Sequence, residues 1–306
     1  MRMRHMIGVM FAKLHASPVL LPIYNLLKIT GIHRLGHIFF DFFERASPNE
    51  VMKKDREELR RHQKELQEAY RLLADERSRQ VLKNAIRFRV TKNRKYLRGI
   101  IEGKQYFVKG IIKPGKEEVF VDCGAFDGDT LKNYLKFNRN YKKIVLFEPS
   151  KANVGRIKGY IARKRLEGID CFQAGVGEKN GIANFTGSAT ADACISEKGS
   201  IQVQIVALDQ VEECQGASFI KMDIEGSELE ALKGAEKIII RNKPTLAICI
   251  YHKAADYYQI PLYLHRLVPE YRLYVRHHFY GYSETVLYAV LSGEGKLGKR
   301  SYGKDK

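Results

Sequence analysis

The sequence has few cysteines, and none lies at a spacing that would give it a structural role. The five cysteines are an odd number without a C-x-x-C pair, which excludes a disulfide framework and gives no indication of a zinc site. Long apolar runs are missing as well. The longest N-terminal stretch without Lys, Arg, Asp or Glu covers residues 14–27 and contains two prolines, whereas a membrane span needs about 20 residues.

These absences predict no transmembrane helix and no secretion signal. Unpaired cysteines fit a reducing environment, so we expect a cytoplasmic protein. A surface-lying apolar segment that places the chain peripherally at the inner face of a membrane stays open as an alternative.

The charge is large and unevenly distributed. The 306 residues carry a net charge of +18, and residues 1–115 contain 25 of the 53 Lys and Arg but only 11 of the 35 Asp and Glu. A basic excess is typical of proteins that meet nucleic acid, an anionic membrane or a phosphorylated substrate. We expect three parts: a basic helical region over residues 1–100 with an accessory role in docking or as a lid, a catalytic domain over 101–292, and a flexible tail over 293–306.

The front part has helical periodicity. Apolar clusters over 6–43 indicate short helices, and Leu59, Leu66 and Leu73 recur at heptad spacing, which predicts a helix over 50–74. A second helix over 75–88 would bury Val81, Leu82, Ala85 and Ile86.

A cationic stretch follows in the front part. Residues 83–98 contain seven Lys and Arg and no acid. Three interpretations stay open: a solvated helix face, contact with an anionic membrane or lipid-linked glycan, and contact with RNA.

After residue 115 the pattern changes to strand, loop and helix. Short apolar runs end in polar loops that precede helical segments, and these runs cover residues 119–121, 144–147, 169–174, 219–222 and 246–250. Such alternation predicts a parallel sheet with helices on both faces. Residues 182–186 and 201–206 are expected to form an inserted pair of strands, and 272–276 and 285–290 the last two strands.

The loop after the first strand reads D-C-G-A-F-D-G-D-T over residues 122–130. Gly124 and Gly128 allow a tight turn and a close approach to a ligand. Neither G-x-G-x-x-G nor G-x-x-x-x-G-K-[ST] is present, and three aspartates would repel phosphates. An acidic glycine loop suits a cationic nucleoside without phosphate, S-adenosylmethionine; a simple turn is the alternative. Glu148, after the second strand, is placed to accept hydrogen bonds from both ribose hydroxyls.

Five segments in this order resemble the FkbM-type methyltransferases, a class I S-adenosylmethionine-dependent family. They are V-F-V-D-C-G-A-F-D-G-D-T (119–130), L-F-E-P (146–149), A-G-V-G-E-K-N-G (174–181), I-V-A-L-D (205–209) and F-I-K-M-D-I-E-G-S-E-L-E-A-L-K-G-A (219–235). The resemblance implies an α/β Rossmann-like domain with a seven-stranded, mostly parallel sheet, here preceded by the helical region. It also implies O-methylation, commonly of sugars, glycans or other small natural products.

The resemblance further implies which residues contact the cofactor. They are Asp122, Gly124, Ala125 and Gly128 at the methionine part, Glu148 and Pro149 at the ribose, Gln173, Ala174 and Val176 at the adenine edge, and Asp223 facing donor and acceptor. Residues 105–107, which precede the glycine loop, are expected to approach the site as a lid does.

Catalysis at a hydroxyl needs alignment and a base for the proton. Ligands of open parallel sheets bind at the carboxyl ends of the strands, where the chain offers Asp223, Glu225 and His252. We expect His252 to act as the base, with Asp223 orienting it or acting itself. An ordinary loop histidine, and a helix N-terminal charge for Glu225, are the alternatives. A divalent cation bound by all three is a further alternative, but no metal is expected.

Residues 251–288 contain nine of the 17 tyrosines, which predicts either an aromatic wall for a sugar acceptor or ordinary packing. The polar loop 188–197 is interpreted as a cover for the acceptor or as a hairpin loop.

The predicted function is an O-methyltransferase acting on a saccharide or small-molecule hydroxyl. An RNA methyltransferase and a non-catalytic scaffold recruited to a membrane-bound glycan assembly are the alternatives. Nucleic acid is not expected as a partner, because no RNA-binding module is present and the fourth motif is M-D-I-E and not N-P-P-Y-like. The sequence does not predict an oligomeric state.

Overall fold

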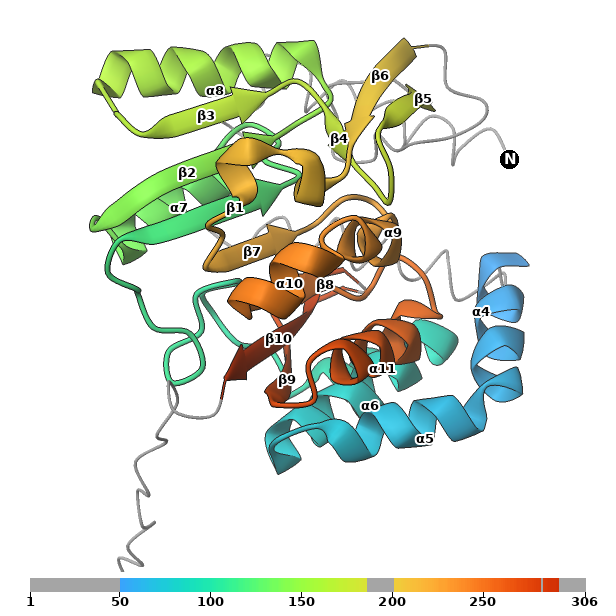
Figure 1. Cartoon of the computed structure of the whole chain (residues 1–306). Helices are drawn as coiled ribbons and strands as arrows, with labels where there is room; N and C mark the ends of the chain where they lie inside the picture. The colour runs from blue at the N-terminus through green and yellow to red at the C-terminus, as the bar shows by residue number, and fades with distance from the viewer. Residues whose placement is uncertain (1–49, 186–200, 282, 292–306) are drawn as a thin grey trace, which may run out of the picture.

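The computed structural model describes residues 50–185, 201–281 and 283–291. The helices expected over 6–43, the loop 188–197 and the tail 293–306 lie outside these residues. Within them, one large sheet has the strand order β3-β2-β1-β7-β8-β10-β9 (Figure 1). Neighbours among the first five strands pair in parallel, whereas β10 is antiparallel to β8 and β9. The predicted seven-stranded, mostly parallel α/β fold is therefore confirmed.

The strands of this sheet are β1 (Glu118–Cys123), β2 (Tyr141–Phe147), β3 (Ile169–Phe172), β7 (Phe219–Met222), β8 (Thr245–Cys249), β9 (Tyr271–His277) and β10 (Thr285–Leu291). A second sheet in the order β4-β6-β5 contains β4 (Gly175–Val176), β5 (Gly181–Phe185) and β6 (Ile201–Val206). The inserted pair is confirmed as β5 and β6, which the structure shows to be antiparallel. The third strand of the large sheet ends at Phe172, two residues before its expected end, because the chain then turns to pair with β6.

Buried strand residues alternate between two apolar layers. Phe120 and Phe219 face one layer with α7 (Asp129–Phe137), α8 (Lys151–Lys164) and residues 106–112. Val121 and Ile220 face the other, which contains α6 (Glu76–Thr91), α9 (Glu228–Lys233), α10 (Glu236–Asn242) and α11 (Asp256–Leu267). The remaining helices are α4 (Glu50–Arg61) and α5 (Gln63–Leu72), with 3-10 turns η1 (Arg94–Leu97), η2 (Leu208–Gln210) and η3 (Glu212–Cys214). None of the helices in the described ranges is long and apolar enough to cross a membrane.

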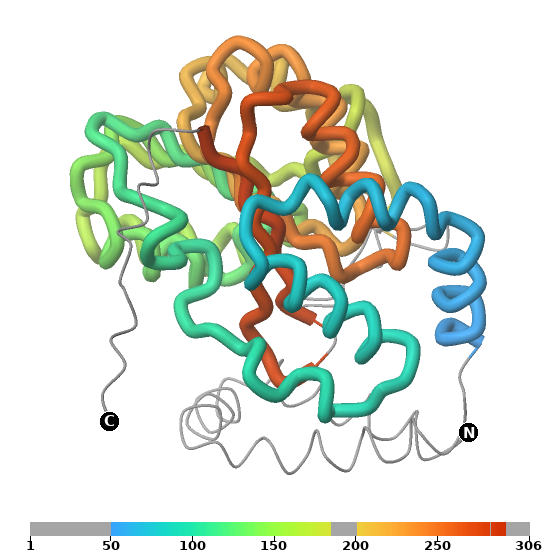
Figure 2. Tube along the Cα trace, turned by 90° about the horizontal axis from the view of Figure 1, so that it is seen from below, coloured from blue at the N-terminus to red at the C-terminus, as the bar shows by residue number. Residues whose placement is uncertain are grey.

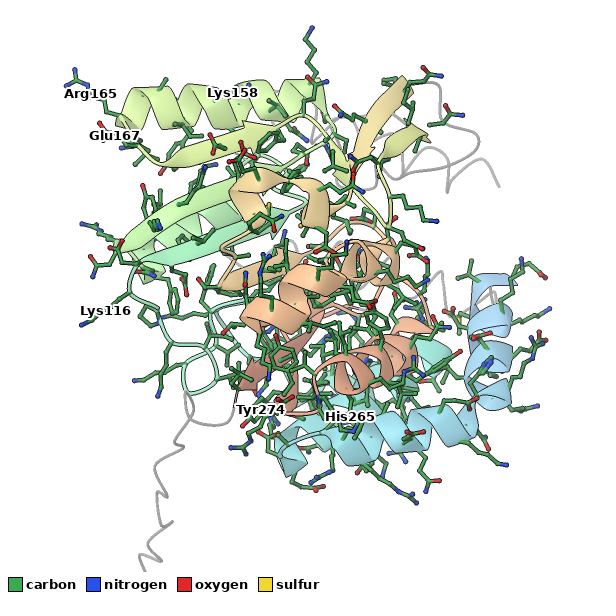
Figure 3. The ribbon with its side chains drawn as sticks, viewed as in Figure 1. Lys116, Lys158, Arg165, Glu167, His265 and Tyr274 are labelled. Atoms are coloured by element: carbon green, nitrogen blue, oxygen red, sulfur yellow. The ribbon has the colours of Figure 1, made fainter. Side chains whose placement is uncertain are left out.

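Lys116 and Glu167, labelled in Figure 3, precede β1 and β3 and mark the edge where the parallel strands begin. The loops that follow β1, β2, β3, β7 and β8 consequently gather at the opposite edge, which is where an open parallel sheet binds its ligands.

The helical front differs from the single helix expected over 50–74. It turns at His62, whose backbone leaves the helical region. The His62 ring stacks on Tyr258 of α11 at 5.0 Å between ring centroids, and the Tyr258 hydroxyl donates to Glu58. The turn lets α5 pack along α11. The second helix, α6, begins after Asp75, which caps the Ser78 amide at 2.6 Å. It buries Val81, Leu82 and Ala85 as expected, whereas Ile86 is only partly buried.

Residues on both sides of α6 cover the outer edge of β9. The Ala74 amide donates to the Leu273 carbonyl, and the Glu102 amide donates to the His277 carbonyl, both at 2.8 Å. An uncovered edge strand would present unpaired backbone groups to other chains. Figure 2 shows the cyan part of the helical front beside the red C-terminal strands, with the blue helix α4 farther out. The front helices and the sheet therefore share one core.

We expect Leu82→Ala to lower the free energy of unfolding of the whole chain by about 2–5 kcal/mol, because Leu82 is 1% exposed in the shared core. Thermal unfolding followed by circular dichroism tests this. The neighbouring exposed Lys83 provides the control, since Lys83→Ala should change the stability by less than about 0.5 kcal/mol. A separate early transition confined to the front helices would contradict a shared core.

Candidate functional site

The glycine loop lies against the end of β7. Gly124 has φ +88°, and a Cβ at this position would lie 1.9 Å from the Asp223 carbonyl oxygen. The Gly124 and Ala125 amides both donate to the Phe147 carbonyl at 3.0 Å. Gly128, at φ +81°, is the N-cap of α7. The loop therefore joins β1, β2 and β7 at one point, and only glycine fits at Gly124.

Glu148 ties the end of β2 to this loop. Its Oε2 accepts from the Phe126 amide at 2.9 Å, and its Oε1 accepts from the Ser150 amide at 2.9 Å and the Asn153 side chain at 3.3 Å. Burial raises the pKa of Glu148, and these hydrogen bonds oppose the rise. Because each carboxylate oxygen has two acceptor sites, Oε1 is filled and Oε2 keeps one, so in this arrangement Glu148 can accept from one ribose hydroxyl and not from both as expected.

Asp122 forms a buried ion pair that the sequence analysis did not anticipate. Its carboxylate is fully buried, 2.9 Å from Lys221 Nζ on β7. Lys221 also donates to the Gly124 carbonyl at 2.8 Å. Burial alone would lower the pKa of Lys221, but the carboxylates of Asp122 and Asp223 raise it above its ordinary value. Asp122 is therefore neutralised within the chain and lies under the loop, which weakens the argument that its charge attracts a cationic ligand.

Asp223 follows β7 and is held by two tyrosines. The Tyr106 hydroxyl donates to Oδ2 at 2.7 Å, and the Tyr251 hydroxyl donates to Oδ1 at 3.0 Å. Burial raises the pKa of Asp223, but Lys221, His252 and both hydroxyls outweigh it, so the pKa is below its ordinary value. The carboxylate is thus ionised at neutral pH, and its side chain stays 21% exposed.

His252 lies among three carboxylates. Its Nε2 is 3.5 Å from both Asp223 Oδ1 and Glu225 Oε2, and its Nδ1 is 2.9 Å from Glu228 Oε1. The structure thus brings together the three predicted catalytic residues. They are also a group of described residues whose ligand atoms lie close enough to share a metal ion.

The electrostatics of this cluster oppose the expected role of His252 as base. Burial lowers the pKa of His252, but Glu225, Glu228 and Asp223 outweigh it and raise the pKa to about 11. In this arrangement both nitrogens of the His252 ring carry a proton at neutral pH, so the ring has no lone pair that could accept the proton of a hydroxyl. Asp223, the alternative of the sequence analysis, is the ionised carboxylate beside it.

Arg89 connects the front helices to this cluster. It is 6% exposed on α6 and donates to the Tyr251 carbonyl and, at 3.1 Å, to the His252 carbonyl. Its charge is paired with Asp55 of α4 at 2.7 Å. Arg89 therefore fits none of the three interpretations of the cationic stretch: it is an internal support for the loop after β8.

The residues predicted to border the adenine and the acceptor differ in how far they are buried. Gln173 is exposed, whereas Ala174 and Val176 are buried in the main core. Pro149 is half-buried. Most of the described tyrosines between 251 and 288 are buried, which is ordinary packing and not an open aromatic wall; they are Tyr251, Tyr257, Tyr258, Tyr271, Tyr274 and Tyr288.

Four residues of the site were missed as functional residues in the sequence. Lys221 and Glu228 flank Asp223 within the K-M-D-I-E-G-S-E segment, and a lysine inside an apolar strand is the signal that could have revealed a buried ion pair. Tyr106, expected as part of a lid, is 6% exposed beneath Asp223. Arg89 had no local signal, because its partners lie more than 160 residues away.

Comparisons with known proteins show the family and the fold of the chain. A family model described as Methyltransferase FkbM domain matches residues 122–283. The structure of methyltransferase FkbM from Methylobacillus flagellatus KT is similar, with 27% identity and a TM-score of 0.67, covering 76% of this chain and 60% of that one. The chain thus spans about 60% of that protein's length. No curated protein matches.

Two other solved structures are more distant. An rRNA methylase from Streptococcus thermophilus has 15% identity and a TM-score of 0.39, covering 60% of this chain and 89% of that one. Fibrillarin from Aeropyrum pernix with S-adenosyl-L-methionine has 13% identity and a TM-score of 0.34, covering 57% and 67%. These similarities are too low to carry an argument about this chain.

We expect Gly124→Ala to weaken S-adenosylmethionine binding more than tenfold, because the new Cβ would displace the Asp223 backbone. Isothermal titration calorimetry measures the affinity. Gly159→Ala is the matched control: Gly159 lies within α8, and a Cβ there would have nothing within 4 Å, so affinity should be kept and stability should rise by about 0.5–1 kcal/mol. Equal affinities of both variants would contradict the close approach.

We expect Arg89→Met to loosen the loop after β8, since the hydrogen bonds to the Tyr251 and His252 carbonyls are lost while the apolar stem is kept. Hydrogen exchange of the amides of residues 251–254 should accelerate at least tenfold beyond any change in global stability. Arg87→Met, at an exposed position on the same helix, should leave this exchange unchanged. Unaltered exchange in Arg89→Met would remove Arg89 as a support.

Proposed function

This chain belongs to the FkbM family of S-adenosylmethionine-dependent methyltransferases, and on that premise we propose that it transfers the methyl group to a hydroxyl oxygen at the Asp223, Glu225 and His252 cluster. The observation that carries the proposal is the contact between the two halves of the site: the glycine loop touches the Asp223 backbone, and the Asp223 side chain begins the cluster. A donor bound on the loop and an acceptor at the cluster would be neighbours.

Alignment is the first requirement of the reaction. Methyl transfer is an in-line displacement, in which the acceptor oxygen forms a bond to the methyl carbon while the bond from that carbon to sulfur breaks. The sulfonium becomes a neutral thioether. The buried pair of Asp122 and Lys221 fixes the loop end on which the donor would rest, so the loop does not have to be ordered during the reaction.

Proton removal is the second requirement, since a hydroxyl acceptor loses its proton as the new bond forms. Asp223 is the residue we assign to this step, because it is ionised, a fifth exposed and oriented by two tyrosine hydroxyls. His252 then acts as a positive neighbour that stabilises the carboxylate, and it does not accept the proton.

The acceptor is proposed to be a hydroxyl of a sugar, glycan or other small natural product, as the family resemblance implies. Exposed cations on α6 and η1 support an anionic carrier such as a lipid-linked glycan or a membrane surface; they are Lys83, Arg87 and Lys95. Because the aromatic residues near the site are mostly buried, acceptor recognition is assigned to polar contacts rather than to stacking.

We expect Asp223→Asn to abolish methylation while donor binding stays within about threefold. The amide cannot take the acceptor proton, and a missing base lowers turnover by about 10²–10⁴-fold. Mass spectrometry of glycans and metabolites from cells that carry the wild-type chain, this variant or neither tests the step. The product should contain one additional CH₂ in the wild type alone. Full methylation by Asp223→Asn would remove this residue from proton transfer, and modified RNA instead of a saccharide would overturn the acceptor class.

We also expect Glu148→Gln to weaken S-adenosylmethionine binding by about tenfold or more, because the charged acceptor for one ribose hydroxyl is lost. Calorimetry with the purified chain gives the affinity. Glu167→Gln, an exposed position before β3 at the opposite edge of the sheet, is the control and should bind as the wild type does. Wild-type affinity in Glu148→Gln would contradict the ribose assignment.

A further inference from the structure

The cluster after β7 and β8 has the dimensions of a metal site. One ligand atom each from Asp223, Glu225 and His252 lies within 4.8 Å of the others, and His252 Nε2 is 3.5 Å from an oxygen of each carboxylate. Neighbouring ligand atoms that bind one ion at about 2.0–2.2 Å are separated by roughly 3.0–3.5 Å. A small contraction of the cluster would therefore bring all three atoms into coordination distance.

The His252 side chain gives independent support. It is only 9% exposed, and neither of its ring nitrogens makes a hydrogen bond of regular geometry, although Nε2 faces two carboxylates and Nδ1 faces a third. The other ring nitrogen, Nδ1, lies 2.9 Å from Oε1 of Glu228, which is fully buried. A metal-binding imidazole commonly has a carboxylate at its second nitrogen, because this contact fixes the tautomer and aims the free nitrogen at the ion.

The surrounding groups are fixed as well. Glu228 Oε1 accepts from the Ile224 amide at 2.9 Å and the Gly226 amide at 3.4 Å, which anchors it below His252. The hydroxyls of Tyr106 and Tyr251 each use one acceptor site on an Asp223 oxygen, so each oxygen keeps another site. Glu225 has φ +55°, a conformation that costs free energy in a residue other than glycine and that is common at functional sites.

We infer that Asp223, Glu225 and His252 together bind one divalent metal ion that accepts both carboxylate and imidazole ligands, such as Mn²⁺ or Co²⁺, and that this ion displaces the proton that Nε2 of His252 carries in the metal-free chain. This inference rests on the proposed function, which it deepens. Three protein ligands leave coordination positions open, and a hydroxyl bound there would lose its proton more easily. The ion would thereby share with the carboxylates the task of activating the acceptor oxygen.

The test uses the purified full-length chain without an affinity tag, after removal of metals with a chelator. We expect Co²⁺ to bind one ion per chain, followed by its visible absorption bands, and Mn²⁺ to bind likewise, followed by electron paramagnetic resonance. His252→Gln and Glu225→Gln should each weaken binding at least tenfold. Glu228→Gln should weaken it by about 10–100-fold, because Glu228 supports the ligand and does not bind the ion.

Glu230→Gln is the matched control, since Glu230 lies on α9 and contacts Lys253 instead of the cluster. It should bind Co²⁺ as the wild type does. Circular dichroism verifies that each variant is folded. Should a variant fail to fold, X-ray absorption of the wild-type Co²⁺ complex still decides, because it must show imidazole and oxygen ligands. Absence of imidazole, or wild-type binding by folded His252→Gln, would overturn the site.

Donor binding separates the two proposals. S-adenosylmethionine is titrated into the metal-free and the Co²⁺-treated chain. Donor binding in both forms, together with no Co²⁺ bound by the treated chain, would overturn only the metal site and leave the proposed function standing. No donor binding in either form would overturn the proposed function itself.

Discussion

The buried ion pair between Asp122 and Lys221 is the interaction on which the site depends. The two residues are paired in register on adjacent strands, and both are removed from water. Loss of either charge would leave the other buried and unpaired, at a cost of about 3–5 kcal/mol. Lys221 also donates to the carbonyls of Cys123 and Gly124. One ammonium group therefore neutralises Asp122 and determines where β1 ends and the glycine loop begins.

The buried carboxylates at the carboxyl edge of the sheet are compensated by positive charge to different degrees. Lys221 compensates Asp122, whereas His252 is surrounded by Asp223, Glu225 and Glu228. The histidine cluster keeps an excess of negative charge, which a proton on the imidazole or a divalent ion reduces. A cationic donor approaching from the glycine loop would meet the same field. The carboxyl edge thus combines the neutral pair of Asp122 and Lys221 with an acidic cluster around His252.

The features that could be predicted from the sequence are those that depend on residues close together in the chain. The strands followed from short apolar runs, and the closeness of Asp223, Glu225 and His252 followed from the rule that parallel strands end at one edge. Sequence reasoning failed for contacts across the fold. The turn at His62 depends on Tyr258, and the role of Arg89 depends on two backbone carbonyls that no pattern marks. The pKa of His252 depends on Glu228, whose burial could not be read from its charge.

The position of β10 has a consequence for biosynthesis. It is the last strand that the structure describes in the chain, yet it occupies an interior place between β8 and β9. While the ribosome is still extending the polypeptide toward residue 285, β8 has an open side and β9 has no sheet to join. Nascent chains in this state expose hydrogen-bonding groups and apolar surface. Completion of the large sheet accordingly has to wait for β10, the last of its described strands to be synthesised.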